Sequence, residues 1–259
     1  MNNYISKIFN LENKVVLLTG AGGFLVGELS RLLAKVGMKV ICCDVNFKNV
    51  EKITKQIIES RGNAIPFELD VTNKTGFEDV LDLVIKKYGR LDCVLNGAGI
   101  NAPTPFFEIS VDEWNKILSV QLTGTMLSCQ VLGSYMVKKM QGSIINISSA
   151  SSGPPLSKAF TYSVSKAGVK NLTQNLAREW GAKGVRVNAL RPGFFPTEWS
   201  KKHFITPERE SSIINHTPMG RYGKPEELVG AVLWLASDAS GFVTGAEIAV
   251  DGGFTAMTI

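Results

Sequence analysis

Short apolar runs alternate with longer segments of helical periodicity along the whole chain, and this alternation restricts the possible folds more than any other feature. Most of the runs are rich in Val and Ile with few polar residues, as is typical of strands buried on both faces. Successive strand–helix–strand units predict a parallel sheet with helices on both faces. The predicted strands are Lys14–Thr19, Lys39–Asp44, Ala64–Leu69, Leu91–Leu95, Gly142–Ile147, Val185–Leu190 and Ala246–Val250.

The segments between these runs carry apolar residues at helical spacing, so that one stripe of each helix can face the sheet. The sequence contains no linker, repeat or low-complexity stretch. The 259 residues are therefore predicted to form one domain, 1–259, with a doubly wound, seven-stranded, Rossmann-type α/β fold. The predicted helices are Phe24–Val36, Val50–Ser60, Thr75–Tyr88, Val111–Met140, Ala159–Gly181 and Pro225–Ser237.

The distribution of charge and of apolar residues argues against several classes of partner. The net charge is +5, but no block of five or more lysines or arginines occurs, so we expect a solvated surface and no nucleic-acid groove. No apolar run approaches the ~18–20 residues of a membrane helix, and the first fourteen residues lack the apolar core of a secretory signal. We therefore expect a cytoplasmic protein without membrane partners.

The cysteines and histidines indicate neither a metal site nor a disulfide framework. The four cysteines lie in apolar segments without a C-x-x-C spacing, and the only histidines are His203 and His216. We interpret the cysteines as buried free thiols in a reducing compartment. They are Cys42, Cys43, Cys93 and Cys129.

A glycine-rich turn follows the first predicted strand and leads into the first predicted helix. Its residues, Thr19-Gly20-Ala21-Gly22-Gly23, allow backbone amides to approach a pyrophosphate. The helix that begins with Phe24 and Leu25 places a partial positive charge at the same point. We interpret the turn as part of a dinucleotide site; a simple tight turn is the alternative.

Polar or small residues end the next three predicted strands. Asp44 follows Gly20 by 24 residues, where a carboxylate can accept hydrogen bonds from the adenosine ribose and repel a 2′-phosphate. No lysine or arginine occurs at 45–47, so we expect NAD as the cofactor; an N-cap role for Asp44 is the alternative. Asp70-Val71 and Asn96-Gly97-Ala98-Gly99 end the third and fourth strands, where ligands of open parallel sheets collect.

Three further residues form a candidate catalytic group. Tyr162 and Lys166 are four residues apart and share one face of a predicted helix, and Ser149 precedes the tyrosine by thirteen residues. A cation beside a phenol favours the phenolate and lowers its pKa from about 10. A serine hydroxyl can hold a substrate oxygen within reach of that phenol. The group is suited to moving a proton on and off an alcohol or carbonyl oxygen.

With these motifs, the chain resembles the single-domain short-chain dehydrogenase/reductases over essentially its whole length. The resemblance rests on the residues above, on Pro192-Gly193 followed by Thr197, and on the tail from Val243-Thr244-Gly245 to Val250-Asp251-Gly252-Gly253. It implies hydride transfer between a nicotinamide cofactor and a secondary alcohol or ketone. Tyr162 is then the general acid/base, Lys166 lowers its pKa and binds the nicotinamide ribose, and Ser149 orients the carbonyl.

The resemblance also implies further cofactor contacts and an assembly. Pro192, Gly193, Phe195 and Thr197 would pack on the nicotinamide and its phosphate. The family implies a homotetramer that pairs through the helices near 111–140 and 159–181. Apolar residues on the first of these helices suggest surface for such a contact. They are Met126, Leu127, Val131, Leu132 and Met136.

The sequence departs from the family pattern in two places. Phe24 and Val26 occupy the second and third glycine positions of the turn motif, and Gly27 falls one place later. Gln121 occupies the position of the family's relay asparagine. It either kinks the helix and holds a relay water, or it is an ordinary helix residue.

The substrate is less constrained than the reaction. The segment Phe194–Arg221 breaks the strand–helix pattern and is interpreted as a substrate lid. Within the family, the stretches Arg191–Glu198 and His216–Arg221 look most like the mannonate oxidoreductase (fructuronate reductase) and gluconate 5-dehydrogenase types, which implies a sugar acid or polyol. Cations in and around the lid suit a carboxylate; a solvated basic loop is the alternative. These cations are Lys158, Arg191, Lys201, Lys202, His203, Arg209 and Arg221.

Two other functions remain open from the sequence. One is a ketoacyl, steroid-type or other carbonyl reductase of the same family. The other is a cofactor-bound sensor that has lost catalysis, against which the intact group of Ser149, Tyr162 and Lys166 argues.

Overall fold

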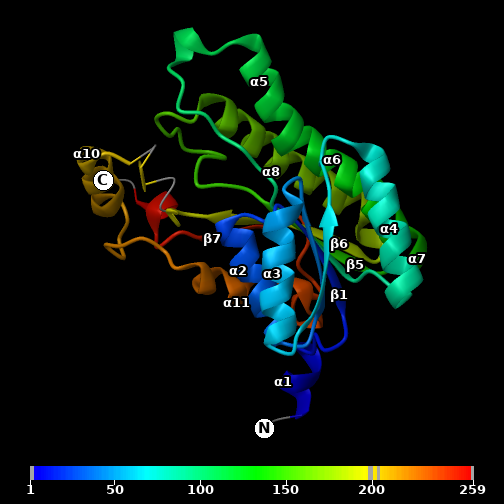
Figure 1. The fold of residues 1–259 in the computed structure, drawn as a ribbon. Coiled ribbons are helices and arrows are strands. Elements are labelled where there is room, and N and C mark those ends of the chain that lie inside the picture. Colours follow the sequence, from blue (N-terminus) through cyan, green and yellow to red (C-terminus); the bar gives the residue numbers. More distant parts are fainter. Residues whose placement is uncertain (1–2, 198–200, 203–204, 258–259) are drawn as a thin grey trace.

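The computed structural model describes residues 3–197, 201–202 and 205–257, and it contains one seven-stranded parallel sheet (Figure 1). The strand order is β3-β2-β1-β4-β5-β6-β7, which confirms the predicted doubly wound fold. The strands are β1 (Val15–Thr19), β2 (Lys39–Asp44), β3 (Asn63–Glu68), β4 (Cys93–Asn96), β5 (Gly142–Ile147), β6 (Val185–Pro192) and β7 (Glu247–Val250).

The strand register brings the carboxyl ends of the central strands to one edge of the sheet. Thr19, at the end of β1, is aligned with Cys43 on one side and with Asn96 on the other. Asn96 is in turn aligned with Asn146. The chain order reverses between β1 and β4, and ligands of open α/β sheets bind in the crevice at such a switch point.

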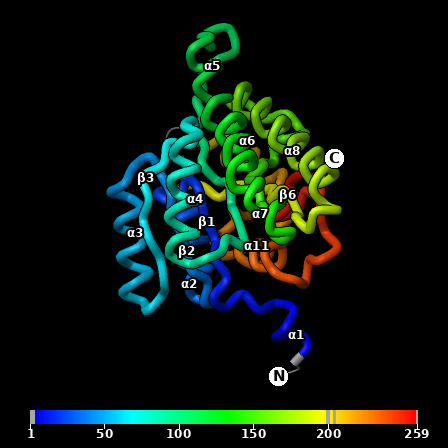
Figure 2. The backbone as a smooth tube through the Cα atoms, turned by 90° about the vertical axis from the view of Figure 1, so that its right-hand side faces the viewer, coloured from blue at the N-terminus to red at the C-terminus, as the bar shows by residue number. Residues whose placement is uncertain are grey.

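Helices cover both faces of the sheet and bury two separate cores. On one face, α2 (Phe24–Lys35), α3 (Phe47–Glu59) and α11 (Val229–Ala236) pack against side chains such as Val16 and Leu18. On the other, α4 (Lys74–Tyr88), α8 (Phe160–Trp180) and the helical run between them pack against side chains such as Leu17 and Ile41. Figure 2 looks onto this second layer. Consecutive strand residues thus point into opposite cores.

The predicted helix 111–140 is a continuous helical run interrupted twice by π-helical turns. Gly124 follows the first turn, and a Cβ at this position would lie 2.8 Å from Val71. Gly133 ends the second turn, and a Cβ there would lie 2.6 Å from Trp180. The run therefore packs closely against its neighbours, and π-turns shift the side chains that follow them. Its parts are α5 (Val111–Leu118), the π-turn Ser119–Thr123, α6 (Gly124–Ser128), the π-turn Cys129–Gly133 and α7 (Ser134–Lys139).

The apolar residues of this run were expected at a subunit contact, and that expectation is wrong for the two of them that the monomer itself buries. Leu132 and Met136 are fully buried within the monomer. Leu127 and Val131 are partly buried and pack against the same core. The apolar surface of Leu132 and Met136 is used inside the subunit, because this face of the run covers the sheet.

The lid segment and the N-terminus contain helices that the strand–helix pattern did not predict. α10 (Pro207–Asn215) lies within the lid, and α1 (Asn3–Ile8) precedes β1. The Thr206 side chain caps α10 by accepting a hydrogen bond from the Arg209 backbone N–H, and proline occupies the first position of the helix. Both signals are present in the sequence. Among the described residues, no helix combines the length and apolar character needed to cross a membrane.

Candidate active site

A cavity of about 980 Å³ lies along the carboxyl ends of the strands and extends under the lid. It brings together all four predicted catalytic side chains, Gln121, Ser149, Tyr162 and Lys166. Most of the predicted cofactor residues also line it: Gly20, Gly23, Phe24, Leu25, Asp44, Asp70, Val71, Gly97, Ala98, Gly193, Phe195 and Thr197.

The glycine-rich turn fits a pyrophosphate. Gly20 has φ +76°, and a Cβ there would lie 2.7 Å from the Ala98 Cα, so the two chain segments meet without side chains between them. α2 then begins after Gly23, and no side chain caps its N-terminus. Orphan backbone N–H groups at a helix start bind anions. A phosphate of a dinucleotide would therefore be held by the α2 amides.

Four predicted cofactor residues do not line the cavity themselves: Thr19, Gly22, Asn96 and Pro192. The Thr19 hydroxyl accepts hydrogen bonds from the backbone N–H groups of Gly97 and Ala98, at 3.2 and 3.3 Å. Asn96 is buried and donates to the Asn146 side chain at 2.9 Å. These contacts join the ends of β1, β4 and β5.

Asp44 stands at the end of β2 with both carboxylate oxygens engaged. Oδ2 accepts from the Gly22 backbone N–H at 3.1 Å, and Oδ1 accepts from the Asn46 backbone N–H at 2.9 Å. The N-cap of α3 is Asn46, whose side chain accepts from the Asn49 N–H, so Asp44 does not cap this helix. A Cβ at Gly22 would lie 2.9 Å from the Asp44 Cγ. The carboxylate is thus held against the glycine turn at the cavity wall.

Tyr162 and Lys166 lie on the first two turns of α8, as their spacing predicted, and Ser149 faces them from the segment after β5. The Lys166 Nζ lies 5.5 Å from the centre of the Tyr162 ring and donates to the Ile147 carbonyl at 2.7 Å. Ser149 hydrogen-bonds the Tyr162 side chain and also accepts from the Ser151 N–H at 3.2 Å. The three side chains form one polar group in an otherwise mainly apolar pocket.

The pKa values of this group differ from the simple expectation. Burial raises the pKa of Tyr162, and the hydrogen bond with Ser149 only partly opposes that rise. Burial also lowers the pKa of Lys166 to about 7. A lysine that is only partly charged near neutral pH, and that bonds a carbonyl, stabilises a phenolate weakly. The expected lowering of the tyrosine pKa is therefore absent in this arrangement.

Gln121 is not an ordinary helix residue. It sits in the first π-turn, is 1% exposed, and donates from Nε2 to the Ile100 carbonyl at 2.8 Å. Its Oε1 has no hydrogen-bond partner within the described chain. A Cβ at Gly99 would lie 2.7 Å from this oxygen, so the amide occupies the space beside the glycine. The side chain thus presents an unused acceptor beside the cavity.

The lid cations divide into two groups. Lys158 and Arg209 line the cavity, and Arg209 donates to the Ser157 hydroxyl and carbonyl at 2.8 and 2.9 Å. This contact joins α10 to the segment that precedes α8. Burial lowers the pKa of Arg209, though the guanidinium stays charged at all ordinary pH values.

The remaining lid cations lie elsewhere. Arg191 pairs with Glu247 at 3.1 Å, and Arg221 pairs with Glu227 at 2.7 Å. Neither arginine lines the large cavity. Lys201 and Lys202 are exposed, and His203 lies outside the described residues.

The sequence did not single out one further cavity cation, Lys116 on α5. It precedes Val120 by four residues, and Val120 and Gln121 also line the cavity, so helical periodicity around Gln121 would have found it. The described acidic residues of the lining are Asp44, at the end of β2, and Asp70, which follows β3. The cations lie on α5, α8, α10 and the segment before α8. The acidic lining residues therefore lie at the β2–β3 edge of the sheet, while the basic ones come from helices and from the segment before α8.

Comparison with known proteins gives consistent matches over the whole fold. Residues 27–255 match the family model described as "Enoyl-(Acyl carrier protein) reductase". The chain is 36% identical over 243 residues to the 3-oxoacyl-[acyl-carrier-protein] reductase FabG of Thermotoga maritima, covering 94% of this chain and 98% of that protein.

Two solved structures are similar in both fold and sequence. A putative D-mannonate oxidoreductase from Haemophilus influenza with bound NAD has a TM-score of 0.89 and 33% identity, covering 96% of this chain and 97% of that one. A gluconate 5-dehydrogenase from Burkholderia cenocepacia in complex with NADP and tartrate has a TM-score of 0.93 and 29% identity, covering 98% and 100%.

Proposed function

This chain belongs to the short-chain dehydrogenase/reductase family, and from that premise we propose that it is an NAD-dependent oxidoreductase of a sugar acid or related polyol. Membership makes it an oxidoreductase that acts on CH–OH groups with a nicotinamide cofactor. The choice of cofactor and substrate is our proposal.

The reaction follows from the group at the start of α8. The bound nicotinamide supplies or accepts the hydride at the carbon centre. In the reducing direction, Tyr162 gives its hydroxyl proton to the carbonyl oxygen, and Ser149 holds that oxygen by a hydrogen bond. In the oxidising direction the phenolate takes the proton back. Lys166 would hold the nicotinamide ribose when the cofactor is bound, and it stabilises the phenolate when it carries its charge.

The raised pKa of Tyr162 gives each direction its own pH dependence. The phenol is protonated through the neutral range, so ketone reduction has its acid available and loses it only as pH rises. Alcohol oxidation needs the phenolate, and its kcat/KM is expected to rise with pH.

Asp44 is the basis for proposing NAD. Its carboxylate is held by two backbone N–H groups at the cavity wall, and no lysine or arginine occurs at 45–47 to receive a 2′-phosphate. One similar structure holds NAD and another holds NADP, so the relatives alone leave this choice open.

The distribution of charge in the cavity is the observation that carries the substrate proposal. Lys116, Lys158 and Arg209 line the cavity, and Arg209 belongs to the lid segment itself, while the acidic lining residues are Asp44 at the end of β2 and Asp70 after β3. A carboxylate at the end of the substrate remote from the reacting carbon would meet these cations, in a space that excludes water when the lid closes. The tartrate bound by the similar gluconate 5-dehydrogenase is also a hydroxylated acid.

A substrate panel tests this proposal. NADH absorbance is followed with fructuronate and gluconate and with the matching neutral compounds, fructose and sorbitol. We expect at least one acid to exceed its neutral counterpart about tenfold in kcat/KM, roughly 1.4 kcal/mol. Arg209→Met should remove that advantage while leaving turnover of the neutral compound unchanged, and Arg221→Met, outside the cavity, is the matched control.

A β-ketoacyl reductase is the second candidate, because the chain is 36% identical to a 3-oxoacyl-[acyl-carrier-protein] reductase. It uses the same proton chemistry on a different substrate. Preferential reduction of a β-ketoacyl thioester in the same panel would favour it. Absence of turnover with every compound, together with tight NADH binding, would favour the third function, a cofactor-bound sensor that has lost catalysis.

We also propose that the protein is a cytoplasmic homotetramer. The four cysteines are free and buried, as suits a reducing compartment. Large apolar side chains are exposed near the start of α5 and of α8, and ring centres of Phe106 and Phe160 lie 5.3 Å apart. Light scattering at micromolar concentration should give four times the chain mass; a stable monomer would contradict the proposal. These exposed residues are Phe106, Phe107, Val111, Phe160 and Val164.

A further inference from the structure

Glu247, the first residue of β7, is a largely buried carboxylate that lies within the tail motif but was assigned no role from the sequence. Its side chain is 9% exposed. Oε1 accepts hydrogen bonds from the hydroxyls of Ser148 and Ser152, both at 2.7 Å. Oε2 pairs with Lys170 and with Arg191, both at 3.1 Å. Each oxygen thus has two partners, which is enough to keep a buried carboxylate charged.

The partners of Glu247 come from the segments that carry the active site. Ser148 and Ser152 bracket Ser149, so one oxygen holds both ends of the short segment that presents this hydroxyl. Lys170 lies on α8, one turn after Lys166 and two turns after Tyr162. A single carboxylate therefore links the serine segment to the helix of the other two residues.

The backbone alone does not make this link. The Ser148 and Ala150 N–H groups donate to β6 carbonyls, at 2.7 and 3.0 Å, which fixes the serine segment to the sheet. Neither bond reaches α8. Lys166 ties α8 to the Ile147 carbonyl at the end of β5, and the side chains of Glu247 and Lys170 add a second polar connection between the helix and the serine segment.

The charge state supports a firm link. Burial by itself raises the pKa of Glu247, but hydrogen bonds from Ser152, Ser148 and Lys170 outweigh it, and the net pKa is lowered. The carboxylate is therefore ionised throughout the neutral range, and hydrogen bonds to an ionised group are shorter and stronger than neutral ones.

We propose that Glu247 is a positioning residue, which sets the Ser149 hydroxyl at the correct distance from Tyr162 by tying the serine segment to α8. The proposal rests on the proposed function, because it assumes that Ser149 and Tyr162 act on one substrate oxygen. It predicts that loss of the link slows the chemical step without weakening cofactor binding. A displacement of about 1 Å in a reacting group can cost 10²-fold in rate.

The first test is Glu247→Gln, with Asp92→Asn as the matched control. Asp92 is a carboxylate of similar burial, at 8%, that also pairs with an arginine, but it lies at the opposite end of the sheet. We expect Glu247→Gln to lower kcat about 10- to 100-fold per NADH-binding site, with the Kd for NADH within about twofold of the parent. Asp92→Asn should lower the melting temperature while kcat per site stays unchanged.

The second test keeps Glu247 and its ion pairs and removes the hydroxyl donors. Ser148→Ala/Ser152→Ala should reproduce most of the loss in kcat, and it should add little to Glu247→Gln in a double-mutant cycle. If Glu247→Gln fails to fold, the double serine variant still tests the proposal. Unchanged kcat per NADH-binding site in the serine variant, or equal loss in Asp92→Asn, would overturn the proposal.

Failure of this inference is distinguishable from failure of the proposed function. If Tyr162→Phe abolishes turnover while the Glu247 and serine variants do not reduce it, only the positioning role is refuted. If Tyr162→Phe retains turnover, the proposed mechanism itself fails, and the positioning role falls with it.

Discussion

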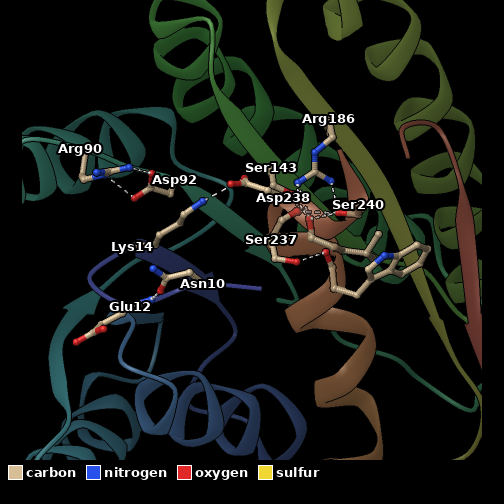
Figure 3. A network of polar contacts seen from close by, with 12 residues as sticks. Asn10, Glu12, Lys14, Arg90, Asp92, Ser143, Arg186, Ser237, Asp238 and Ser240 are labelled. Carbon is tan, nitrogen blue, oxygen red and sulfur yellow. Dashed lines mark hydrogen bonds and ion pairs between the residues drawn. The ribbon is translucent and has the colours of Figure 1, made fainter. Parts of the chain in front are cut away.

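The two ends of the parallel sheet bury polar side chains in different ways. At the amino ends, the polar groups pair with one another (Figure 3). Arg186, near the start of β6, donates to the Ser240 hydroxyl and to the carbonyls of Leu235 and Ser237. Asp92, just before β4, accepts from Arg90 and from the Val15 backbone N–H. Within the described chain, none of these side chains has a buried donor or acceptor that lacks a hydrogen-bond partner.

At the carboxyl ends, several buried polar atoms have no partner within the described chain. Asn96 Oδ1 and Gln121 Oε1 are two of them. Lys166 donates to the Ile147 carbonyl at 2.7 Å, and burial lowers its pKa to about 7. Unpaired buried polar groups cost stability. The polar groups at the amino ends are thus paired, whereas the carboxyl ends keep unpaired polar atoms, of which Gln121 Oε1 belongs to a residue that lines the cavity.

Removing the Tyr162 hydroxyl should have the largest effect. Tyr162→Phe is expected to lower kcat by about 10²–10⁴-fold, the usual contribution of acid–base catalysis, with little change in NADH affinity or melting temperature. Tyr88→Phe, which removes a hydroxyl bonded to Asn63 away from the cavity, is the control. Near-normal turnover of Tyr162→Phe would refute the proposed mechanism.

Asp92→Asn should show the opposite behaviour at the amino end. The change removes the charge from a buried acceptor of Arg90, and we expect the free energy of unfolding to fall by about 1.5–3 kcal/mol. The cavity lies at the other end of the strands, so kcat and KM should remain within about twofold. Urea unfolding measures the free energy of unfolding, and steady-state kinetics measure kcat and KM. A large fall in kcat would contradict the proposed difference between the two ends of the sheet.

Lys166→Met tests how much the buried Lys166 amine, at the carboxyl ends of the strands, lowers the free energy of unfolding. Burial lowers the Lys166 pKa to about 7 in the folded protein, from 10.5. Between these values the unfolded chain binds a proton that the folded chain does not, so the parent becomes more stable as pH rises. The unfolding free energy of the parent, relative to Lys166→Met, should increase by about 2 kcal/mol from pH 7 to pH 9. If the unfolding free energies of the two proteins change equally with pH, burial does not lower the Lys166 pKa to this extent.

Asp44→Ala should have the smallest effect, confined to cofactor choice. We expect the parent to prefer NAD over NADP, and the variant to narrow the ratio of kcat/KM values by about tenfold, or 1.4 kcal/mol. Asp70→Ala, the other acidic residue of the lining, should affect both cofactors alike, because they differ only at the ribose 2′ position. Equal use of both cofactors by the parent would contradict the NAD proposal.

Sequence periodicity determined the layers of the fold and the place of the site. Apolar strands and amphipathic helices bury their surface in only a few ways, so the strand–helix alternation predicted the parallel sheet. Local spacing likewise placed Tyr162 and Lys166 on one helix face. The same local signals could have identified α10 through Thr206 and Pro207.

Contacts between segments far apart in the sequence were decided by the tertiary structure alone. Periodicity gave no reason to expect π-turns at Gln121 and Gly133, because they depend on close packing against distant residues such as Trp180. The sequence shows that Arg191 and Arg209 are cations, but not that one pairs with Glu247 while the other lines the cavity. The pKa values of Tyr162 and Lys166 depend on burial, which raised the first against the expectation from their spacing. Residue type determines which charges a chain carries, whereas the packed fold determines the partners and the solvent that each charge meets.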